Sequence, residues 1–175
     1  MNMPAGPELE RLYDEHAQAL HAFLLSFTRD PADTRDLLQE IFVKLARDGS
    51  LLHGVRQERA FLLRLAHNAA IDLIRRRGTR DRTRDHFAAE SVSPFAPAAD
   101  PDEATFRREL STALAGLPPE QRAVAHLKLW ENLTFEQIAA TLEISPNTAA
   151  SRYRYALDKM RDRLRPLYDE MKRAE

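Results

Sequence analysis

The stretch LTFEQIAATLEISPNTAASRYRYAL, residues 133–157, decides the fold of the second half of this chain. It has the pattern of two helices joined by a tight turn. Thr134 is a good N-cap, and Gln137 three residues later completes the pattern of a capping box. Ser145 and Pro146 then form a second start signal, as an N-cap and the first position of the next helix. This pattern predicts a helix-turn-helix, in which the second helix docks on DNA.

The second helix of this pair is expected to have an apolar side and a polar side. The apolar side consists of Ala149, Tyr153, Ala156, Leu157, Met160 and Leu164. The polar side carries Asn147, Ser151, Arg154 and Asp158, flanked by Thr148, Arg152, Tyr155 and Lys159. Amides, hydroxyls and guanidinium groups at such positions can bond to base edges and phosphates. Many all-α proteins contain similar helix pairs with a solvated face, so this segment alone leaves a purely structural role open.

Composition excludes several classes of protein. The chain has 175 residues, which suits one domain or two small ones, and it has no cysteine, so disulfides and thiolate metal sites are impossible. Its six histidines are scattered without an i,i+4 pair, and we expect surface or boundary positions for them rather than metal ligation. No Ser/His/Asp set, metal-ligand cluster or phosphate-binding glycine loop is present in the sequence. We therefore expect a protein that is not an enzyme and that needs no cofactor.

The chain is also expected to be cytoplasmic. No apolar run approaches the roughly 20 residues that cross a bilayer, so we expect no membrane insertion. The first residues, MNMPAGPELE, lack the basic start and hydrophobic core of a signal peptide.

Positive charge is concentrated locally although the formal net charge is −1. Residues 145–165 hold six basic side chains against two acidic ones, and residues 75–84 hold six arginines against Asp81. Such clusters can bind phosphate even on a neutral chain. Solvated helix ends are the alternative, because Lys and Arg favour the last turn of a helix.

The sequence predicts an all-α protein of two small helical domains joined by a flexible linker. Residues 78–102 show no sustained helical period and contain three of the ten prolines, which is typical of an extended linker. The flanking blocks, residues 8–77 and 103–171, both have helical periodicity and no strand-like alternation. The second block contains the helix-turn-helix.

Three helices are expected in the first block. The apolar stripe of the first helix consists of Leu9, Leu12, Tyr13, Leu20, Phe23, Leu24 and Phe27. Asp30-Pro31 ends that helix, and a second begins at about Asp33, with Leu37, Leu38, Ile41, Phe42 and Leu45 facing inward. Residues 48–57 are predicted to be a loop, and residues 58–77 a third helix. In the second block, four helices are expected. The first is marked by Phe106, Leu110 and Leu114 and ends at Gly116, and the second has Val124, Leu127 and Trp130 facing inward. The helix-turn-helix pair supplies the third and fourth.

The third helix of the first block carries a polar stripe. Its buried side is predicted to be Leu62, Leu65, Ala66, Ala69 and Leu73, and its opposite side Arg64, Asn68, Asp72 and Arg75. An asparagine and two arginines in one stripe could contact an unstacked base and its phosphates. A wet helix face with no ligand is the simpler alternative.

The second helix has an acidic edge formed by Asp36, Gln39 and Glu40, close to the expected exposed parts of Leu37 and Phe42. An acidic, partly apolar face suits a basic protein surface better than DNA. A solvated face is again the simpler alternative.

Taken in order, these segments resemble the extracytoplasmic-function sigma factors, group IV of the sigma-70 family. The resemblance rests on DTRDLLQEIFVKLAR, RAFLLRLAHNAAIDLIRRR and LPPEQRAVAHLKLWENLTFEQIAATLEISPNTAASRYRYALDKMRDRL, and it covers nearly the whole chain. It implies that the chain directs bacterial core RNA polymerase to specific promoters and assists promoter melting. The implied partners are core polymerase and promoter DNA, and the family often has an anti-sigma factor.

The resemblance also implies residue roles. The residues matching the helix that docks on the coiled coil of the largest polymerase subunit are Asp36, Leu37, Gln39, Glu40 and Phe42. Asn68 matches a position that holds a flipped-out base of the minus-ten element. Residues 48–57 match the specificity loop for that base. Arg75 and Arg76 match the basic end of the helix that carries Asn68. The residues matching the start of the helix that reads the minus-thirty-five element are Asn147, Thr148, Ser151 and Arg152. Arg154, on the same helix face, is expected to add a base or phosphate contact.

Three positions depart from the family pattern. Phe61 stands where tryptophan is usual, Glu143 stands where glycine is common in the turn, and Asn147 replaces a common glycine at the start of the second helix. Glu143 must therefore reach the turn geometry without the freedom of glycine. The alternatives to a sigma factor are an autonomous helix-turn-helix regulator or a sigma-like mimic that binds an anti-sigma factor.

Overall fold

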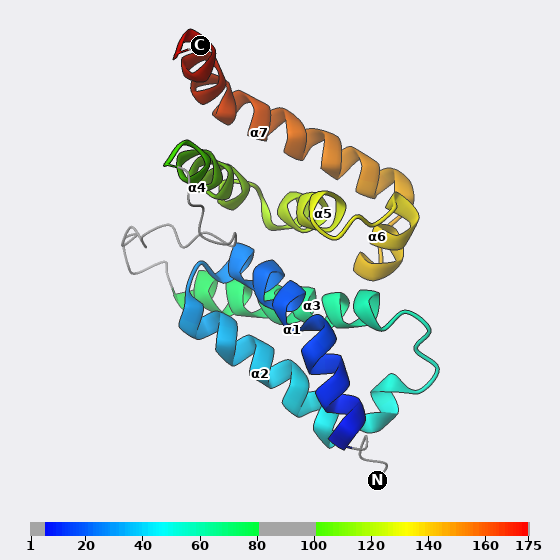
Figure 1. The fold of residues 1–175 in the computed structure, drawn as a ribbon. Coiled ribbons are helices and arrows are strands. Elements are labelled where there is room, and N and C mark those ends of the chain that lie inside the picture. Colours follow the sequence, from blue (N-terminus) through cyan, green and yellow to red (C-terminus); the bar gives the residue numbers. More distant parts are fainter. Residues whose placement is uncertain (1–5, 81–100, 175) are drawn as a thin grey trace. The chain divides into compact units, whose positions relative to one another are not determined.

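The structure, a computed structural model, describes residues 6–80 and 101–174, and each regular element in these ranges is a helix (Figure 1). This confirms the all-α prediction. The chain divides into two compact units, residues 1–89 and 90–175. The central part of the predicted linker lies outside the described residues. Its ends do not, because Gly78 to Arg80 continue a helix of the first unit and residues 101 and 102 begin a helix of the second.

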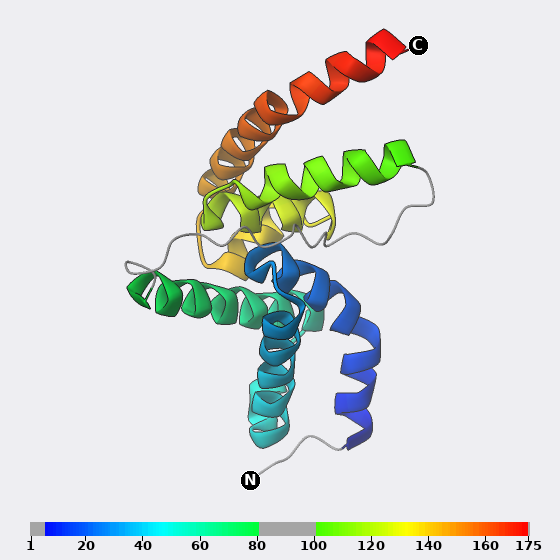
Figure 2. The same cartoon turned by 90° about the vertical axis from the view of Figure 1, so that its left-hand side faces the viewer.

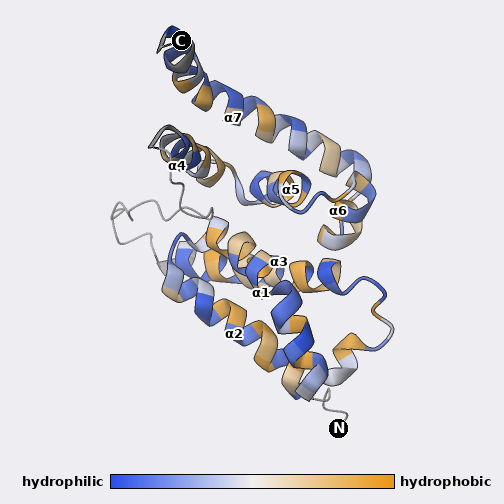
Figure 3. Ribbon diagram, viewed as in Figure 1, coloured by the Kyte–Doolittle hydropathy of each residue, from blue (hydrophilic) through white to orange (hydrophobic). Residues whose placement is uncertain are grey.

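The N-terminal unit is built from α1 (Gly6–Thr28), α2 (Pro31–Arg47), the short 3₁₀ helix η1 (Gly49–Leu52) and α3 (Glu58–Arg80). Helix α1 packs against both α2 and α3, as the two views in Figures 1 and 2 show. Leu12, Phe23, Leu45 and Leu62 are fully buried in this unit, as expected from the apolar periodicity. Polar and apolar residues alternate along α1 and α2 in Figure 3, as expected of amphipathic helices.

Helix α2 begins two residues earlier than the sequence predicted. The carboxylate of Asp30 caps it by accepting hydrogen bonds from the backbone N–H groups of Ala32 at 2.7 Å and Asp33 at 3.1 Å. Pro31 occupies the first helical position, where its missing N–H has no cost. Asp30-Pro31 is therefore both the end of one helix and the start signal of the next.

The buried side of α3 also differs from the prediction. Leu62 and Ala66 are fully buried as expected, but so are Leu63 and Ala70, whereas Leu65, Ala69 and Leu73 are only half-buried. Both α1 and α2 pack against α3. Together they bury a row of apolar residues that is shifted by one position from the predicted row. The helix has apolar residues in both rows, so periodicity alone did not identify the covered one.

The C-terminal unit contains α4 (Pro101–Ala115), α5 (Pro119–Leu129), α6 (Phe135–Leu142) and α7 (Pro146–Ala174). Each of the other three helices packs against α7. Leu114, Ala156 and Met160 lie in the common core, while Leu110, Trp130 and Leu164 pack against it from partly buried positions. Of the apolar residues that mark α4 in the sequence, Phe106 is 42% exposed. It lies more than a turn before the part of α4 that reaches the core.

The short helix α5 is buried on almost every side, and two of its buried residues are basic. Arg122 is 8% exposed, and its guanidinium donates hydrogen bonds to the carbonyl oxygens of Leu114 at 3.1 Å and Leu117 at 2.8 Å, which closes the corner between α4 and α5. His126 is 2% exposed and its ring lies 5.2 Å from that of Trp130, so the predicted surface or boundary position of this histidine was wrong. The surrounding helices leave no solvated face at its position.

The predicted helix-turn-helix is formed by α6 and α7. The capping box is complete: Gln137 N–H donates to Thr134 Oγ1 at 3.2 Å, and Thr134 N–H donates to Gln137 Oε1 at 2.8 Å. Glu143 ends α6 with a left-handed backbone, φ 57° and ψ 45°. Ile144 N–H then bonds to the Ala139 carbonyl at 3.0 Å, and Ser145 Oγ accepts from Thr148 N–H at 3.0 Å to start α7. The turn is thus made from a residue that adopts this conformation at a cost.

None of the helices among the described residues combines the length and the apolar character that crossing a membrane requires.

Glu143→Gly is predicted to stabilise the C-terminal unit relative to Glu143→Ala by about 1 kcal/mol, because only glycine adopts a left-handed backbone without crowding its Cβ. The alanine variant is the matched control, since it removes the same side chain and keeps the strained backbone. Trp130 is the single tryptophan of the chain and lies in this unit, so its fluorescence in a urea titration measures this transition. Equal midpoints for the two variants would show that the turn is unstrained.

Candidate nucleic-acid interface

The first turns of α7 present the polar run that the sequence predicted. Asn147 and Arg154 are exposed, and Ser151 and Arg152 are half-buried. The side chain of Thr148 also takes part in the N-cap of α7, because its hydroxyl lies 2.8 Å from Ser145 Oγ. Of the five predicted DNA-binding residues of α7, Thr148 takes part in the N-cap and serves first to start the helix.

The opposite side of α7 is held by packing that sequence reasoning identified only in part. Ala149 and Ala156 are fully buried, as expected. Tyr153 is half-buried, and its ring packs edge-on against that of Phe135 with a centroid distance of 5.7 Å. The ammonium of Lys128 lies 4.9 Å from the Phe135 ring centroid and donates to the Leu133 carbonyl at 3.0 Å. These contacts hold the polar face of α7 on a rigid base.

In the N-terminal unit, a hollow of about 210 Å³ lies between α2 and α3. Its lining residues are Glu40, Ile41, Lys44, Leu65, Asn68, Ala69, Asp72 and Arg76. The hollow explains why Leu65 and Ala69 are only half-buried. Glu40, predicted to contact polymerase, thus lines the same hollow as Asn68 and Arg76, predicted to contact DNA.

Two arginines near the end of α3, Arg75 and Arg76, both contact Asp72. Arg75 Nη1 lies 3.8 Å from Asp72 Oδ1, and Arg76 Nε donates to the Asp72 carbonyl oxygen at 3.3 Å. Both arginines are exposed. At the other end of the stripe, the guanidinium of Arg64 lies 5.4 Å from the centroid of Phe61, the residue that replaces tryptophan.

The acidic face of α2 is exposed as predicted, but two of its proposed members are not. Asp36, Gln39 and Glu40 are exposed, whereas Leu37 is 3% and Phe42 8% exposed. The expectation that Leu37 and Phe42 have usable exposed parts was therefore wrong. The ring of Tyr13 covers Phe42 edge-on at a centroid distance of 5.0 Å, because α1 lies along α2.

The apolar part of this surface comes from other residues. Tyr13 is about half exposed and Val43 more than a third. They help to line a hollow of about 460 Å³, together with Leu9, Arg35, Leu38, Gln39, Phe42 and Ala46. Val43 follows Asp36 and Gln39 at helical spacing, so a helical wheel of α2 already contained the signal that it shares their face. Tyr13 belongs to α1, and only the packing of the two helices brings it here.

Another hollow of about 460 Å³ lies between α4 and the second half of α7. Its lining is formed by Phe106, Arg161, Leu164, Arg165, Leu167, Tyr168 and Asp169. Exposed Phe106 and Tyr168 give it apolar area, and its charged lining residues are Arg161, Arg165 and Asp169. Such a surface has the chemistry of a protein contact rather than of a catalytic site.

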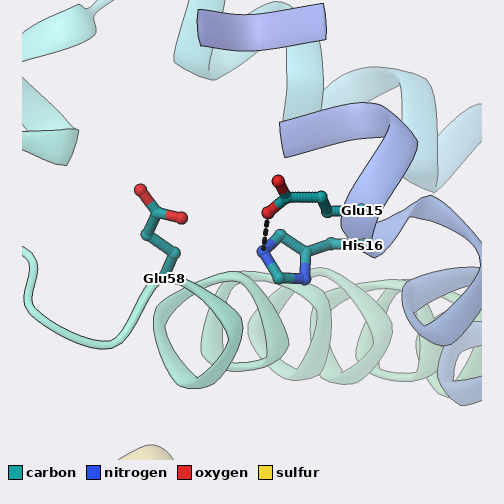
Figure 4. A group of neighbouring side chains, drawn as sticks. All are labelled: Glu15, His16 and Glu58. Carbon is teal, nitrogen blue, oxygen red and sulfur yellow. Dashed lines mark ion pairs between the residues drawn. The ribbon is translucent and has the colours of Figure 1, made fainter. Parts of the chain in front are cut away.

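One histidine and two carboxylates meet where α1 passes the start of α3 (Figure 4). The ligand atoms of Glu15, His16 and Glu58 lie within 4.8 Å of one another, close enough to suggest a cation. Arg11 already occupies the position between the carboxylates, donating to Glu15 at 2.9 Å and to both oxygens of Glu58 at 2.8 and 3.1 Å. These hydrogen bonds lower the pKa of Glu58 below its ordinary value. The group is an ion-paired clamp that anchors the end of the 48–57 loop on α1.

The predicted loop, residues 48–57, contains the short 3₁₀ helix η1 and is locally bonded. Asp48 Oδ1 accepts a hydrogen bond from Ser50 N–H at 3.1 Å, and Gly54 has φ 75°, a conformation that favours glycine. His53, Arg56 and Gln57 are exposed on it. Asp48 and Ser50 are exposed as well, so the predicted specificity loop offers several polar side chains in the segment that precedes α3.

Comparison with known proteins adds independent findings. The family model described as sigma-70 region 2 matches residues 12–80, and that of sigma-70 region 4 matches residues 107–160. The RNA polymerase sigma factor CarQ of Myxococcus xanthus is 31% identical over 171 residues, covering 97% of this chain and 96% of that protein. The ECF RNA polymerase sigma factor SigL of Mycobacterium tuberculosis is 33% identical over 161 residues, and the match covers 91% of this chain and 90% of SigL.

The fold is also found in solved structures. The sigma factor RpoE from Bartonella quintana, in complex with the anti-sigma factor NepR, is 22% identical with a TM-score of 0.71, covering 91% of this chain and 95% of that one. CnrH, in complex with the cytosolic domain of CnrY, is 22% identical with a TM-score of 0.64, covering 90% of this chain and 88% of that one. At this level of identity the likeness concerns the fold.

Proposed function

Because the chain belongs to the extracytoplasmic-function sigma factors of the sigma-70 family, we propose a division of labour between its two units. Its function is to direct core RNA polymerase to specific promoters in transcription initiation, and it is not an enzyme. Region 2 and region 4 matches on one chain favour this function over that of an autonomous helix-turn-helix regulator.

The proposed polymerase contact is the exposed face of α2. Asp36, Gln39 and Glu40 supply negative charge and hydrogen-bonding groups, and the neighbouring Tyr13 and Val43 supply apolar area. Charge complementarity of this kind steers association and sets the register of an interface. We assign Leu37 and Phe42 a supporting role, since both are buried and act by holding α2 against α1.

The proposed contact with the melted minus-ten element is the α2–α3 hollow with Asn68 at its edge. The amide of Asn68 can both donate to and accept from the edge of an unpaired base, and Arg75 and Arg76 are exposed close by for the phosphates. The hollow has apolar walls from Ile41 and Leu65, which suit the face of a base. Residues 48–57 are proposed to add specificity at this site.

The proposed contact with the minus-thirty-five element is the start of α7. Asn147, Ser151, Arg152 and Arg154 are the residues available to base edges and phosphates in the major groove. Thr148 is proposed to contribute mainly through the N-cap. The single observation that carries this assignment is the exposed polar run on a helix whose opposite side is packed by Ala149 and Ala156.

We further propose that an anti-sigma factor regulates the chain in the cytoplasm, where core polymerase is found. Of the two solved structures with the same fold, one is a sigma factor in complex with the anti-sigma factor NepR, and the other is CnrH in complex with the cytosolic domain of CnrY. The apolar hollows of the two units, at Tyr13 and at Phe106, are surfaces that such a partner could cover.

Run-off transcription tests the function as a whole. The purified chain is predicted to bind duplex DNA weakly by itself and to support transcription from selected promoters only after core polymerase is added. Tight binding to a duplex without core polymerase, as a dimer on two half-sites, would instead identify an autonomous regulator.

Asp36→Arg is predicted to weaken assembly with core polymerase by about tenfold or more, because it places a like charge against a basic surface. Copurification and fluorescence anisotropy with labelled chain measure the effect. Asp14→Arg is the matched control, since it makes the same charge change at an exposed position of α1. If Asp36→Arg and Asp14→Arg assemble equally well with core polymerase, the α2 face is not the docking surface.

Asn68→Ala is predicted to spare closed-complex binding and to slow open-complex formation by about tenfold, the cost of one base contact. A pre-melted promoter bubble should not fully rescue it, because the unpaired base still lacks its partner. Permanganate footprinting of thymines in the melted region measures the step. Gln18→Ala truncates an exposed amide on α1 and is the control. Normal melting together with normal sensitivity to every base of the downstream element would leave Asn68 as a solvated helix residue.

A further inference from the structure

Tyr155 is the one residue of the outward run at the start of α7 with a large aromatic surface, and it is 52% exposed. The core of the C-terminal unit does not use it, because Ala156 and Met160 face inward at the neighbouring positions. An aromatic ring is costly to leave in water, and exposed tyrosines are enriched where one protein surface meets another molecule. The exposure of this ring therefore indicates that Tyr155 contacts another molecule.

The place of Tyr155 along α7 fits a DNA groove. It follows Thr148 by seven residues and Ser151 by four, so all three lie on one helical face. With a rise of about 1.5 Å per residue, the run from Asn147 to Tyr155 is about 12 Å long, which equals the width of the major groove. Tyr155 is thus at the far end of the segment that the groove can hold.

The residue one turn further along marks the end of this segment. Asp158 is exposed, and a carboxylate facing phosphates would be repelled. Its Oδ1 lies 3.5 Å from Arg161 Nη1, and the ion pair offsets its charge at the edge of the surface. The DNA-compatible run accordingly begins at Asn147 and ends at Tyr155.

The ring of Tyr155 is held by its neighbour. The guanidinium carbon of Arg154 lies 5.4 Å from the ring centroid, within the range of a cation–π contact. This contact restricts both side chains before DNA arrives, which lowers the entropy lost on binding. It leaves the guanidinium N–H groups available to a guanine edge or a phosphate.

We propose that Tyr155 reads a thymine in the upstream promoter element by packing its ring against the thymine 5-methyl group, with Arg154 oriented by the same ring. This inference rests on the proposed function of α7. The methyl group is the apolar feature that thymine displays in the major groove, so it is the base group that the carbon face of a tyrosine matches. A hydroxyl bond to phosphate would carry no sequence information and would need no ring-bound arginine.

The experiment uses holoenzyme made from the full chain and core polymerase, and duplexes that it selects from a random library. Each thymine of the selected upstream element is replaced in turn by deoxyuracil, which removes one methyl group. At one position, parent holoenzyme should bind the uracil duplex about three- to fivefold more weakly, the effect of one buried methyl. Tyr155→Ala should bind both duplexes equally, whereas Tyr155→Phe should keep the preference for thymine.

Tyr168→Ala is the matched control, because it removes an exposed tyrosine of the same helix that lines the α4–α7 hollow. It should leave the thymine preference unchanged. A methyl effect that persists in Tyr155→Ala would overturn the inference, and so would equal losses in Tyr155→Phe and Tyr155→Ala, which indicate a hydroxyl contact. Weaker assembly of Tyr155→Ala with core polymerase, with an unchanged thymine preference, would assign the ring to a protein contact instead.

Failure of the inference is distinguishable from failure of the proposed function. Arg152→Ala should weaken binding to the selected duplexes whether or not Tyr155 reads a methyl group. If Arg152→Ala weakens binding while no uracil position depends on Tyr155, only the inference fails. If the holoenzyme selects no upstream element at all, the proposed role of α7 fails and the inference fails with it.

Discussion

The left-handed turn at Glu143 is the constraint on which the C-terminal unit depends. It stops α6 after two turns, lets Ile144 bond back to the Ala139 carbonyl, and places Ser145 where it can cap α7. The direction of α7, and hence the surface that its first turns present, follows from this short connection. A glutamate in this conformation carries a cost that glycine would not. The packing of α7 against α4, α5 and α6 offsets that cost.

Both units place their polar sites on the outer faces of helices whose inner faces form the core. Asn68 is exposed on α3 while Ala66 and Ala70 are buried, and Ser151 lies opposite buried Ala149 and Ala156. Side chains on such helices need little ordering when they bind, since the backbone is already rigid. The buried guanidinium of Arg122 serves the same end by closing the α4–α5 corner through backbone carbonyls.

The α2–α3 hollow joins two proposed functions in one place. Glu40 belongs to the face proposed to meet polymerase, and Asn68 to the site proposed to hold an unpaired base, yet both line the same hollow. Helix α2 therefore has a core side, a side proposed to face polymerase and an edge that adjoins the proposed nucleic-acid site. A small three-helix unit can do this because each helix has more surface than the core requires.

The sequence by itself determined the all-α class, the extent of most helices, the capping box at Thr134 and the helix-turn-helix. These features depend on periodicity and on residues close along the chain, which a single sequence displays. The tertiary structure decided which of two apolar rows of α3 is buried, that Leu37 and Phe42 belong to the core, and that Tyr13 supplies the apolar surface beside Asp36. It also decided that Glu40 and Asn68 line one hollow. Each of these depends on how one helix lies against another, and that packing joins residues that no local pattern relates.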